Sequence, residues 1–216
     1  MADLVLHHFP GACSQVAVCA LEMAGLSYRL ELVDLPKNAQ ASPEYLKISP
    51  LGKVPLLVID GVGLSENAAI LTYIAALAPD AGIFPADPSP RAKAEAVGGL
   101  SFCGGTLHPT IRGLANPQRV TTGDGEGVRE QSRYLANKAF GYAERRLAEC
   151  GWWLGTVSIV DVYLNWAFYV ARKAKLEVIP FPLLNDLASR LADQLPAFRA
   201  MQAEEATSRA TLGLPA

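Results

Sequence analysis

The hydrophobic and polar positions of residues 1–80 change repeatedly between strand and helix patterns. Leu4–Phe9 is predicted to be a strand, and Cys13–Gly25 a helix that ends at its glycine. Tyr28–Leu35 alternates apolar and polar residues, as half-buried strands do. Together these three segments predict a βαβ unit. Ser42–Ser49 is expected to form a short helix, with its first serine as the cap and a proline in the next position.

A hairpin and a further helix are predicted after this unit. Val54–Glu66 contains two strand patterns that meet at Asp60 and Gly61, where the chain is expected to turn. Asn67 can cap the following helix, which runs to about Ala78. These elements complete a mixed α/β domain over residues 1–80.

Strand patterns stop after the segment Ala78–Arg91, whose four prolines favour an irregular connector. Five helices are predicted beyond it, near Pro90–Leu114, Gly127–Cys150, Ser158–Lys173, Leu183–Gln194 and Pro196–Glu204. We therefore expect an α/β domain over residues 1–80, a linker over 81–90 and an all-helical domain over 91–216.

The helix that begins near Ser158 has a strong capping signal. Ser158 can serve as the N-cap and Asp161 follows three residues later, as in a capping box. Val157 and Val162 can form the flanking hydrophobic staple. This pattern favours a structural role for Asp161 over that of a catalytic acid.

The composition narrows the possible partners. The 216 residues are 50% hydrophobic and 19% charged, with a net charge of -2, which is typical of a globular protein without a basic surface for nucleic acid. No apolar run reaches membrane-spanning length and no secretory signal begins the chain, so neither a membrane partner nor export is expected. The irregularly spaced cysteines contain no CxxC pair, which predicts no metal site and a cytoplasmic protein with reduced thiols; they are Cys13, Cys19, Cys103 and Cys150.

Cys13 follows a Pro-Gly turn and falls where a helix is predicted to begin. Unpaired backbone N–H groups and the positive end of the helix dipole favour a thiolate there. The ordinary alternative is a small, buried apolar residue. Ser14 could donate a hydrogen bond to such a thiolate, but a helix cap is its more common role.

Two further segments offer groups that could bind a peptide-like ligand. Pro55 is expected at a strand edge; an ordinary trans proline is favoured, whereas a cis bond would turn the N–H and C=O of Val54 towards an extended peptide. Glu66 and Asn67 lie at a helix start, where backbone donors can hold a carboxylate and Glu66 can pair with an ammonium group. A plain cap beside a surface glutamate is the alternative.

The segment Ala96–Leu114 is rich in glycine but keeps a helical apolar period through Val97, Leu100, Gly104, Leu107, Ile111 and Leu114. We predict a bend between Gly104 and Pro109, because proline lacks an N–H and crowds the preceding turn. A small polar face lies beside the apolar one and is made of Ser101, Gly105, His108 and Arg112. It would either leave room for a bulky substrate or let two helices approach closely.

The segments "PGACS", "GKVPLLV", "LSENAAILTYIA" and "VSIVDVYL" occur in an order that resembles a glutathione transferase, most closely of the bacterial beta class, over essentially the whole chain. The resemblance implies an N-terminal thioredoxin-like βαβαββα domain followed by an all-α domain. It also implies a cis Pro55 and a cytoplasmic homodimer that acts in detoxification.

The same resemblance assigns residues to a site. Cys13 would face or bond the glutathione thiol, and Ser14 and His108 are the other catalytic candidates. Ser101 and Thr106 fall where the class lets a neighbouring subunit reach glutathione. The full set implied to bind glutathione is Cys13, Lys37, Val54, Pro55, Glu66, Asn67, Ser101 and Thr106. The second-substrate pocket is expected to include His8, Gly105, His108 and Arg112.

The resemblance therefore implies an enzyme with glutathione as its co-substrate, and no metal is expected. It would carry out thiol–disulfide exchange at Cys13, conjugation of glutathione to a hydrophobic electrophile, or both. A glutathione-dependent dehalogenase or ether-cleaving lyase, a non-catalytic glutathione-binding interaction protein, and a thiol oxidoreductase independent of glutathione are the alternatives.

Overall fold

The computed structural model describes residues 2–215, which divide into two compact units. The sheet unit extends up to Ile83 and includes the segment from Leu195 onward, and the helical unit is Phe84–Gln194. The sequence prediction placed all of residues 91–216 in one helical domain. That assignment is wrong for the C-terminal segment, because α9 (Pro196–Thr211) packs along α1 (Ser14–Ala24) of the sheet unit.

The sheet unit contains a four-stranded sheet in the order β2-β1-β3-β4. Its strands are β1 (Leu4–His8), β2 (Arg29–Leu32), β3 (Leu56–Ile59) and β4 (Val62–Ser65). β1 is parallel to β2 and antiparallel to β3, and β3 is antiparallel to β4. The predicted βαβ unit and hairpin are therefore both present. Asp60 and Gly61 both have positive φ angles, 48° and 86°, as a two-residue hairpin turn requires.

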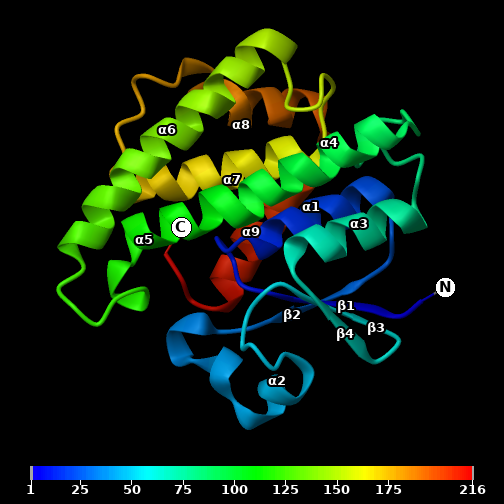
Figure 1. Ribbon diagram of the computed structural model, residues 1–216. Helices are drawn as coiled ribbons and strands as arrows, with labels where there is room; N and C mark the ends of the chain where they lie inside the picture. The colour runs from blue at the N-terminus through cyan, green and yellow to red at the C-terminus, as the bar shows by residue number, and fades with distance from the viewer. Residues whose placement is uncertain (1, 216) are drawn as a thin grey trace. The chain divides into compact units, whose positions relative to one another are not determined.

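Helices cover both faces of this sheet (Figure 1). α1 and α3 (Asn67–Leu77) lie together on one face, and α2 (Pro43–Ile48) lies on the other, after two short 3₁₀ turns at Leu35–Lys37 and Ala39–Ala41. The core under α2 is small and includes Val33, Tyr45 and Leu56. Ser42 caps α2 as predicted, because its Oγ accepts the N–H of Tyr45 at 3.1 Å.

The helical unit is a group of packed helices in which α5 packs against α6 and α7, and α8 packs against the same two helices. Its elements are α4 (Pro90–Ser101), α5 (His108–Ala115), α6 (Glu126–Cys150), α7 (Ile159–Lys173) and α8 (Pro182–Gln194), with a 3₁₀ turn at Pro117–Arg119. Glu144 of α6 accepts the N–H groups of Leu183 and Leu184 at 2.7 and 3.0 Å. A carboxylate from a neighbouring helix thus satisfies the first turn of α8.

A π-helical segment, Phe102–Leu107, separates α4 from α5. The N–H of His108 donates to the carbonyl of Cys103, five residues earlier. This wider turn accommodates Pro109, which has no N–H to donate. The π-helical segment lies where a bend between Gly104 and Pro109 was predicted, and it begins earlier, at Phe102. Val97 is exposed, contrary to the predicted apolar face, because the buried positions in α4 and at the start of the π-helical segment are those of Ala96, Leu100 and Cys103.

The predicted capping box at α7 is confirmed. Asp161 is fully buried. Its carboxylate accepts a hydrogen bond from the N–H of Trp153 at 2.8 Å and from both the N–H and the hydroxyl of Ser158 at 3.0 Å. Burial raises the pKa of Asp161 to about 6, although these hydrogen bonds oppose the rise. The carboxylate therefore joins the Trp153 loop to the start of α7.

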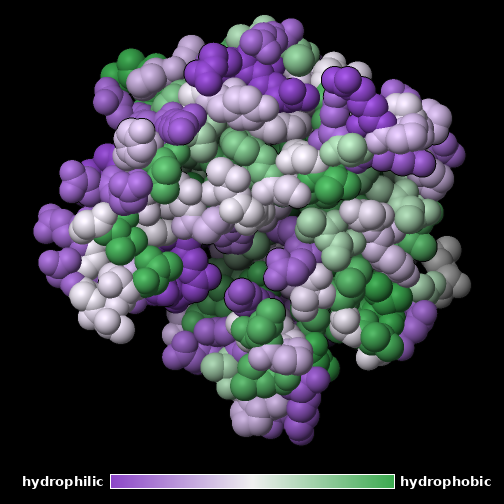
Figure 2. All heavy atoms as spheres, in the orientation of Figure 1, coloured by the Kyte–Doolittle hydropathy of each residue, from purple (hydrophilic) through white to green (hydrophobic). Residues whose placement is uncertain are grey.

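Hydrophobic side chains gather over α2 and the β3–β4 hairpin on the face shown in Figure 2. The exposed large apolar residues here are Leu46 and Ile48 of α2, Leu51 of the following loop and Val62 of β4. Gly63 permits a close approach of the two elements, because a Cβ there would lie 2.9 Å from the carbonyl oxygen of Ile48. Among residues 2–215, every helix is too short or too polar to cross a membrane.

Candidate active site

Cys13 occupies the N-cap position of α1, immediately after a tight turn. In this turn the N–H of Ala12 donates to the carbonyl of Phe9 at 3.0 Å. Pro10 supplies the fixed φ of the first central position, and Gly11 has the positive φ of 84° that the second position requires. The short sequence "FPGAC" therefore forms the turn through which the chain passes from β1 into α1, and it places Cys13 at the start of that helix.

The Cys13 thiol is largely withdrawn from solvent, with 7% of the residue exposed. Its Sγ donates to the carbonyl oxygen of Val54 at 3.8 Å. Burial raises the pKa of Cys13 to about 12; backbone hydrogen bonding and the charge of Lys53 lower it, and the charge of Glu66 raises it further. Burial therefore opposes the thiolate that this helix start was expected to favour, because desolvation outweighs the favourable backbone donors.

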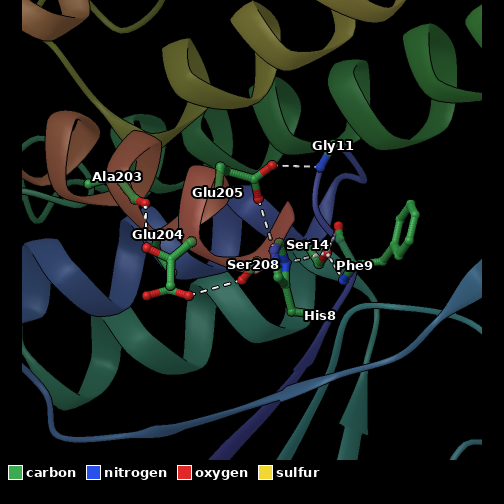
Figure 3. Close-up of polar contacts among 9 residues, drawn as sticks. His8, Phe9, Gly11, Ser14, Ala203, Glu204, Glu205 and Ser208 are labelled. Carbon is green, nitrogen blue, oxygen red and sulfur yellow. Dashed lines mark hydrogen bonds and ion pairs between the residues drawn. The ribbon is translucent and has the colours of Figure 1, made fainter. Parts of the chain in front are cut away.

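His8 and Ser14 are buried beneath the turn rather than exposed to a ligand (Figure 3). The Oγ of Ser14 lies 2.8 Å from Nδ1 of His8 and also exchanges hydrogen bonds with the backbone of Phe9. Nε2 of His8 lies 2.9 Å from a carboxylate oxygen of Glu205. His8 is therefore not a pocket-lining residue, and Ser14 neither caps α1 nor has its hydroxyl available for a bound sulfur.

The Val54–Pro55 peptide bond is cis, as the family resemblance implied and as the sequence alone did not favour. The loop before it is held by Tyr45, whose hydroxyl donates to the carbonyl of Lys53 at 2.8 Å, and by Ser49, which donates to the same oxygen at 3.2 Å. Sequence reasoning missed Lys53 as a charged group near Cys13. Its position directly before Val54 is the signal that could have identified it.

Glu66 and Asn67 begin α3 beside the Cys13 loop. Asn67 is buried and its Nδ2 donates to the carbonyl of Cys13 at 2.9 Å. It therefore ties α3 to the loop that bears Cys13 instead of capping its own helix. Glu66 is exposed, has a φ of 73°, and lies close enough to Cys13 for its charge to act on the thiol. The predicted convergence of Cys13, Val54 and the start of α3 is thus present.

Lys37, the other residue of the sheet unit implied to bind glutathione, lies at the end of a 3₁₀ turn. Its ammonium group is exposed and pairs with Asp34 at 2.8 Å. Hydrogen bonding to Lys37 holds the pKa of Asp34 below its ordinary value. A ligand carboxylate would have to share or replace this pair.

The predicted site residues of the helical unit cluster around the π-turn. Nδ1 of His108 lies 3.3 Å from the hydroxyl of Tyr163, and its ring meets Trp166 edge-on at 4.7 Å. Sequence reasoning missed Tyr163 and Trp166, because both belong to the strongly apolar α7. Four further candidates from this unit are exposed: Ser101, Gly105, Thr106 and Arg112. A side chain added at Gly105 would meet open space.

The chemistry of the sheet unit suits a small thiol peptide. The first turn of α1 presents backbone donors beside Cys13, and such donors stabilise a sulfur anion. Glu66 offers a carboxylate for an ammonium group, and Lys53 offers a cation for a carboxylate.

Comparisons with known proteins agree with this arrangement. Residues 2–76 match the family model "Glutathione S-transferase, N-terminal domain". The chain is 32% identical to glutathione S-transferase GST-4.5 of Xanthomonas campestris, over 92% of this chain and 98% of that protein. It is also 30% identical to maleylacetoacetate isomerase of Pseudomonas aeruginosa, over 83% of this chain and 86% of that protein.

Solved structures give the same result. A glutathione transferase homologue from Sulfitobacter, with bound glutathione, superposes with a TM-score of 0.85 at 25% identity and covers 94% of this chain and 99% of its own. A bacterial beta class glutathione S-transferase from Sphingomonas chungbukensis has a TM-score of 0.81 at 28% identity, covering 93% and 98%. The chain therefore has the glutathione transferase fold and belongs to the glutathione S-transferase family.

Proposed function

We propose that this protein conjugates glutathione to a hydrophobic electrophile and that the Cys13 thiol is a hydrogen-bond donor to the glutathione sulfur. The observation that carries the proposal is the contact of Cys13 Sγ with the carbonyl oxygen of Val54 at the start of α1. A cysteine that rests as a neutral, buried thiol is suited to donate a hydrogen bond and poorly suited to act as a nucleophile.

Glutathione binding would exchange the partners of this contact. The cysteinyl N–H of glutathione would donate to the Val54 carbonyl in place of Cys13, and Pro55 would shape this edge. The Cys13 thiol would then turn to the glutathione sulfur. That sulfur loses its proton to solvent and is stabilised as an anion by Cys13 and the start of α1. It attacks the electrophilic carbon, a C–S bond forms, and the leaving group departs with the electron pair of the broken bond.

The remaining contacts in the proposal follow the charges of the tripeptide. Glu66 would pair with the γ-glutamyl ammonium group, and the first N–H groups of α3 would hold the neighbouring carboxylate, with Asn67 fixing their position. The ammonium groups of Lys37 and Lys53 would pair with the glycine carboxylate. Ser101 and Thr106 remain proposed contacts from a second subunit. Gly105, His108 and Arg112 remain proposed contacts for the electrophile, and Tyr163 joins them through its 3.3 Å contact with His108.

Glu66→Ala is expected to raise the dissociation constant for glutathione about 10- to 100-fold, because a charge-assisted contact contributes roughly 1.5–3 kcal/mol. Titration calorimetry measures this change. Glu44→Ala is the matched control, since Glu44 is also exposed but lies on α2. Equal affinities for the Glu66 and Glu44 variants would show that Glu66 is only a surface residue.

Two other activities have specific support. Thiol–disulfide exchange is favoured by the presence of a cysteine at the helix start, and isomerisation by the similarity to the Pseudomonas aeruginosa maleylacetoacetate isomerase. Dehalogenation and ether cleavage would use the same glutathione sulfur.

One set of assays separates these activities. Retention on immobilised glutathione is measured first, followed by turnover of chloro-dinitrobenzene, hydroxyethyl disulfide and maleylacetoacetate. We expect retention and the highest kcat/KM with chloro-dinitrobenzene. Faster turnover of hydroxyethyl disulfide or of maleylacetoacetate would show that disulfide exchange or isomerisation, and not conjugation, is the main activity. Retention without any turnover would favour a binding protein, and the absence of both would refute the proposal.

We also propose that the protein is a cytoplasmic homodimer of the beta class with a role in detoxification. The similarity to the Sphingomonas chungbukensis enzyme supports the class assignment. The exposed apolar side chains of α2 and the β3–β4 hairpin support association, because large apolar patches on a surface are typical of protein contacts. Light scattering measures the molecular mass in solution, and a value near 23.0 kDa would contradict a dimer.

A further inference from the structure

Glu205 of α9 contacts two parts of the chain that flank the Pro-Gly turn (Figure 3). Its Oε2 accepts the N–H of Gly11 at 2.5 Å, and its Oε1 lies 2.9 Å from Nε2 of His8, the last residue of β1. The second contact has the distance of an ion pair, but the atoms are not aligned for a hydrogen bond. One carboxylate from a distant helix therefore holds the end of β1 and the centre of the turn that leads to Cys13.

The contacts of His8 determine which ring nitrogen carries a proton. A bare Nε2 lone pair would repel a carboxylate 2.9 Å away, so Nε2 is protonated. If the ring is neutral, Nδ1 accepts the hydroxyl proton of Ser14 at 2.8 Å. If the ring is charged, Nδ1 donates to Ser14, and Ser14 donates to the carbonyl of Phe9 at 3.3 Å. In both states Glu205, His8 and Ser14 form one connected chain.

This chain of contacts has the residue types of a hydrolase triad but not its accessibility. Ser14 and His8 are both fully buried, so the serine cannot meet a substrate. What the three residues touch is the backbone: the carbonyl and N–H of Phe9 and the N–H of Gly11. Arg209, one turn after Glu205, also lies against the turn, because a Cβ at Gly11 would approach its guanidinium nitrogen to 2.8 Å.

We propose that Glu205 and His8 are positioning residues: from α9 and the end of β1 they hold the Phe9–Cys13 turn, and thereby place the Cys13 thiol. The effect on turnover rests on the proposed function, whereas the effect on the thiol itself does not. A thiol displaced by even about 1 Å donates poorly to the bound sulfur, so kcat falls while binding through Val54 and Glu66 persists.

Glu205→Ala removes both contacts, and Glu205→Gln separates hydrogen bonding from charge. The glutamine amide oxygen can still accept from Gly11, and its NH₂ can donate to a bare Nε2 of His8. Nδ1–H of His8 then donates to Ser14, so the contacts of Glu205 with Gly11 and His8 and of His8 with Ser14 are all kept, with the opposite tautomer of His8. Glu204→Ala is the matched control on the same helix, since Glu204 bonds to Ser208 and not to the turn.

The first measurement is the rate at which iodoacetamide alkylates Cys13 and Cys19, resolved by mass mapping. Cys19 is fully buried on the same helix and therefore reports general opening of α1. We expect Glu205→Ala to raise Cys13 alkylation about tenfold while Cys19 changes less than about twofold, because only the turn is released. Glu205→Gln and Glu204→Ala are expected to stay within about threefold of the unaltered protein.

The second measurement is conjugation kinetics. Glu205→Ala is expected to lower kcat about tenfold with KM for glutathione within about twofold, and Glu205→Gln to restore kcat. Unchanged Cys13 alkylation, or an equal rise at Cys13 and Cys19, would overturn the proposal. A glutamine variant as impaired as the alanine variant would also overturn it. If the unaltered protein fails to conjugate glutathione, the proposed function is refuted, and the alkylation ratio still decides the positioning role.

Discussion

Replacing Asp161 by alanine is expected to lower the free energy of unfolding by about 3–5 kcal/mol and the melting temperature by roughly 10 °C. The variant leaves the buried N–H groups of Trp153 and Ser158 without their acceptor and removes the cap of α7. Chemical denaturation and differential scanning calorimetry at pH 7 measure the effect. Asp186→Ala, at an exposed acidic position on α8, is the control and should stay within about 0.5 kcal/mol.

Asp161 also gives the stability a defined pH dependence. Because burial raises its pKa in the folded state to about 6, above the unfolded value of 3.8, the folded protein binds the proton more tightly. This group's contribution to stability is therefore fully present below about pH 4 and is lost as the pH rises to about 6, by roughly 3 kcal/mol in all.

Asp161→Asn tests this sign. Its amide cannot ionise, so the difference in unfolding free energy between this variant and the unaltered protein should change between pH 4 and pH 6 and be constant above that range. A difference that does not vary with pH would show that the carboxylate keeps an ordinary pKa. If Asp161→Ala were as stable as Asp186→Ala, the capping contacts of Asp161 would contribute little to the free energy of unfolding.

Replacing Cys13 by alanine is expected to lower kcat for conjugation about 10- to 100-fold, while KM for glutathione changes little. The glutathione anion loses a hydrogen bond to a charged acceptor, which contributes roughly 1.5–3 kcal/mol. The contacts at Val54 and Glu66 lie elsewhere on the tripeptide and persist. Steady-state kinetics with chloro-dinitrobenzene measure both constants.

Cys13→Ser distinguishes a donor from a nucleophile at this position. A serine hydroxyl can still donate to the glutathione anion, so conjugation should remain within about threefold of the unaltered enzyme. The serine variant cannot form a disulfide, so exchange with hydroxyethyl disulfide should be lost if it passes through Cys13. A serine variant as slow in conjugation as the alanine variant would mean that the sulfur itself reacts.

Features with a local cause could be predicted from the sequence. The turn at Asp60 and Gly61, the cap at Ser42 and the capping box at Ser158 each depend on a few consecutive residues, and each was found. The approach of Val54 and Glu66 to Cys13 was also expected, although the cis bond at Pro55 came from the family resemblance.

Features that depend on distant segments could not be predicted. The helix start around Cys13 favours a thiolate, and nothing nearby in the sequence shows that burial outweighs it. His8 looked available to a substrate because its partner, Glu205, is almost two hundred residues away. Val97 was misplaced because a π-turn changes the register of a helix without a distinctive sequence signal other than Gly104, Gly105 and Pro109.

The placement of α9 on the sheet unit has a consequence for biosynthesis. The chain leaves that unit at Ile83 and returns to it at Leu195, so the helical unit is an insertion within it. A ribosome therefore completes all four strands and the whole helical unit before it makes Glu205. The contact between Glu205 and the Phe9–Cys13 turn therefore forms only after α9 has been made, and until then the turn of the nascent sheet unit that bears Cys13 lacks this support.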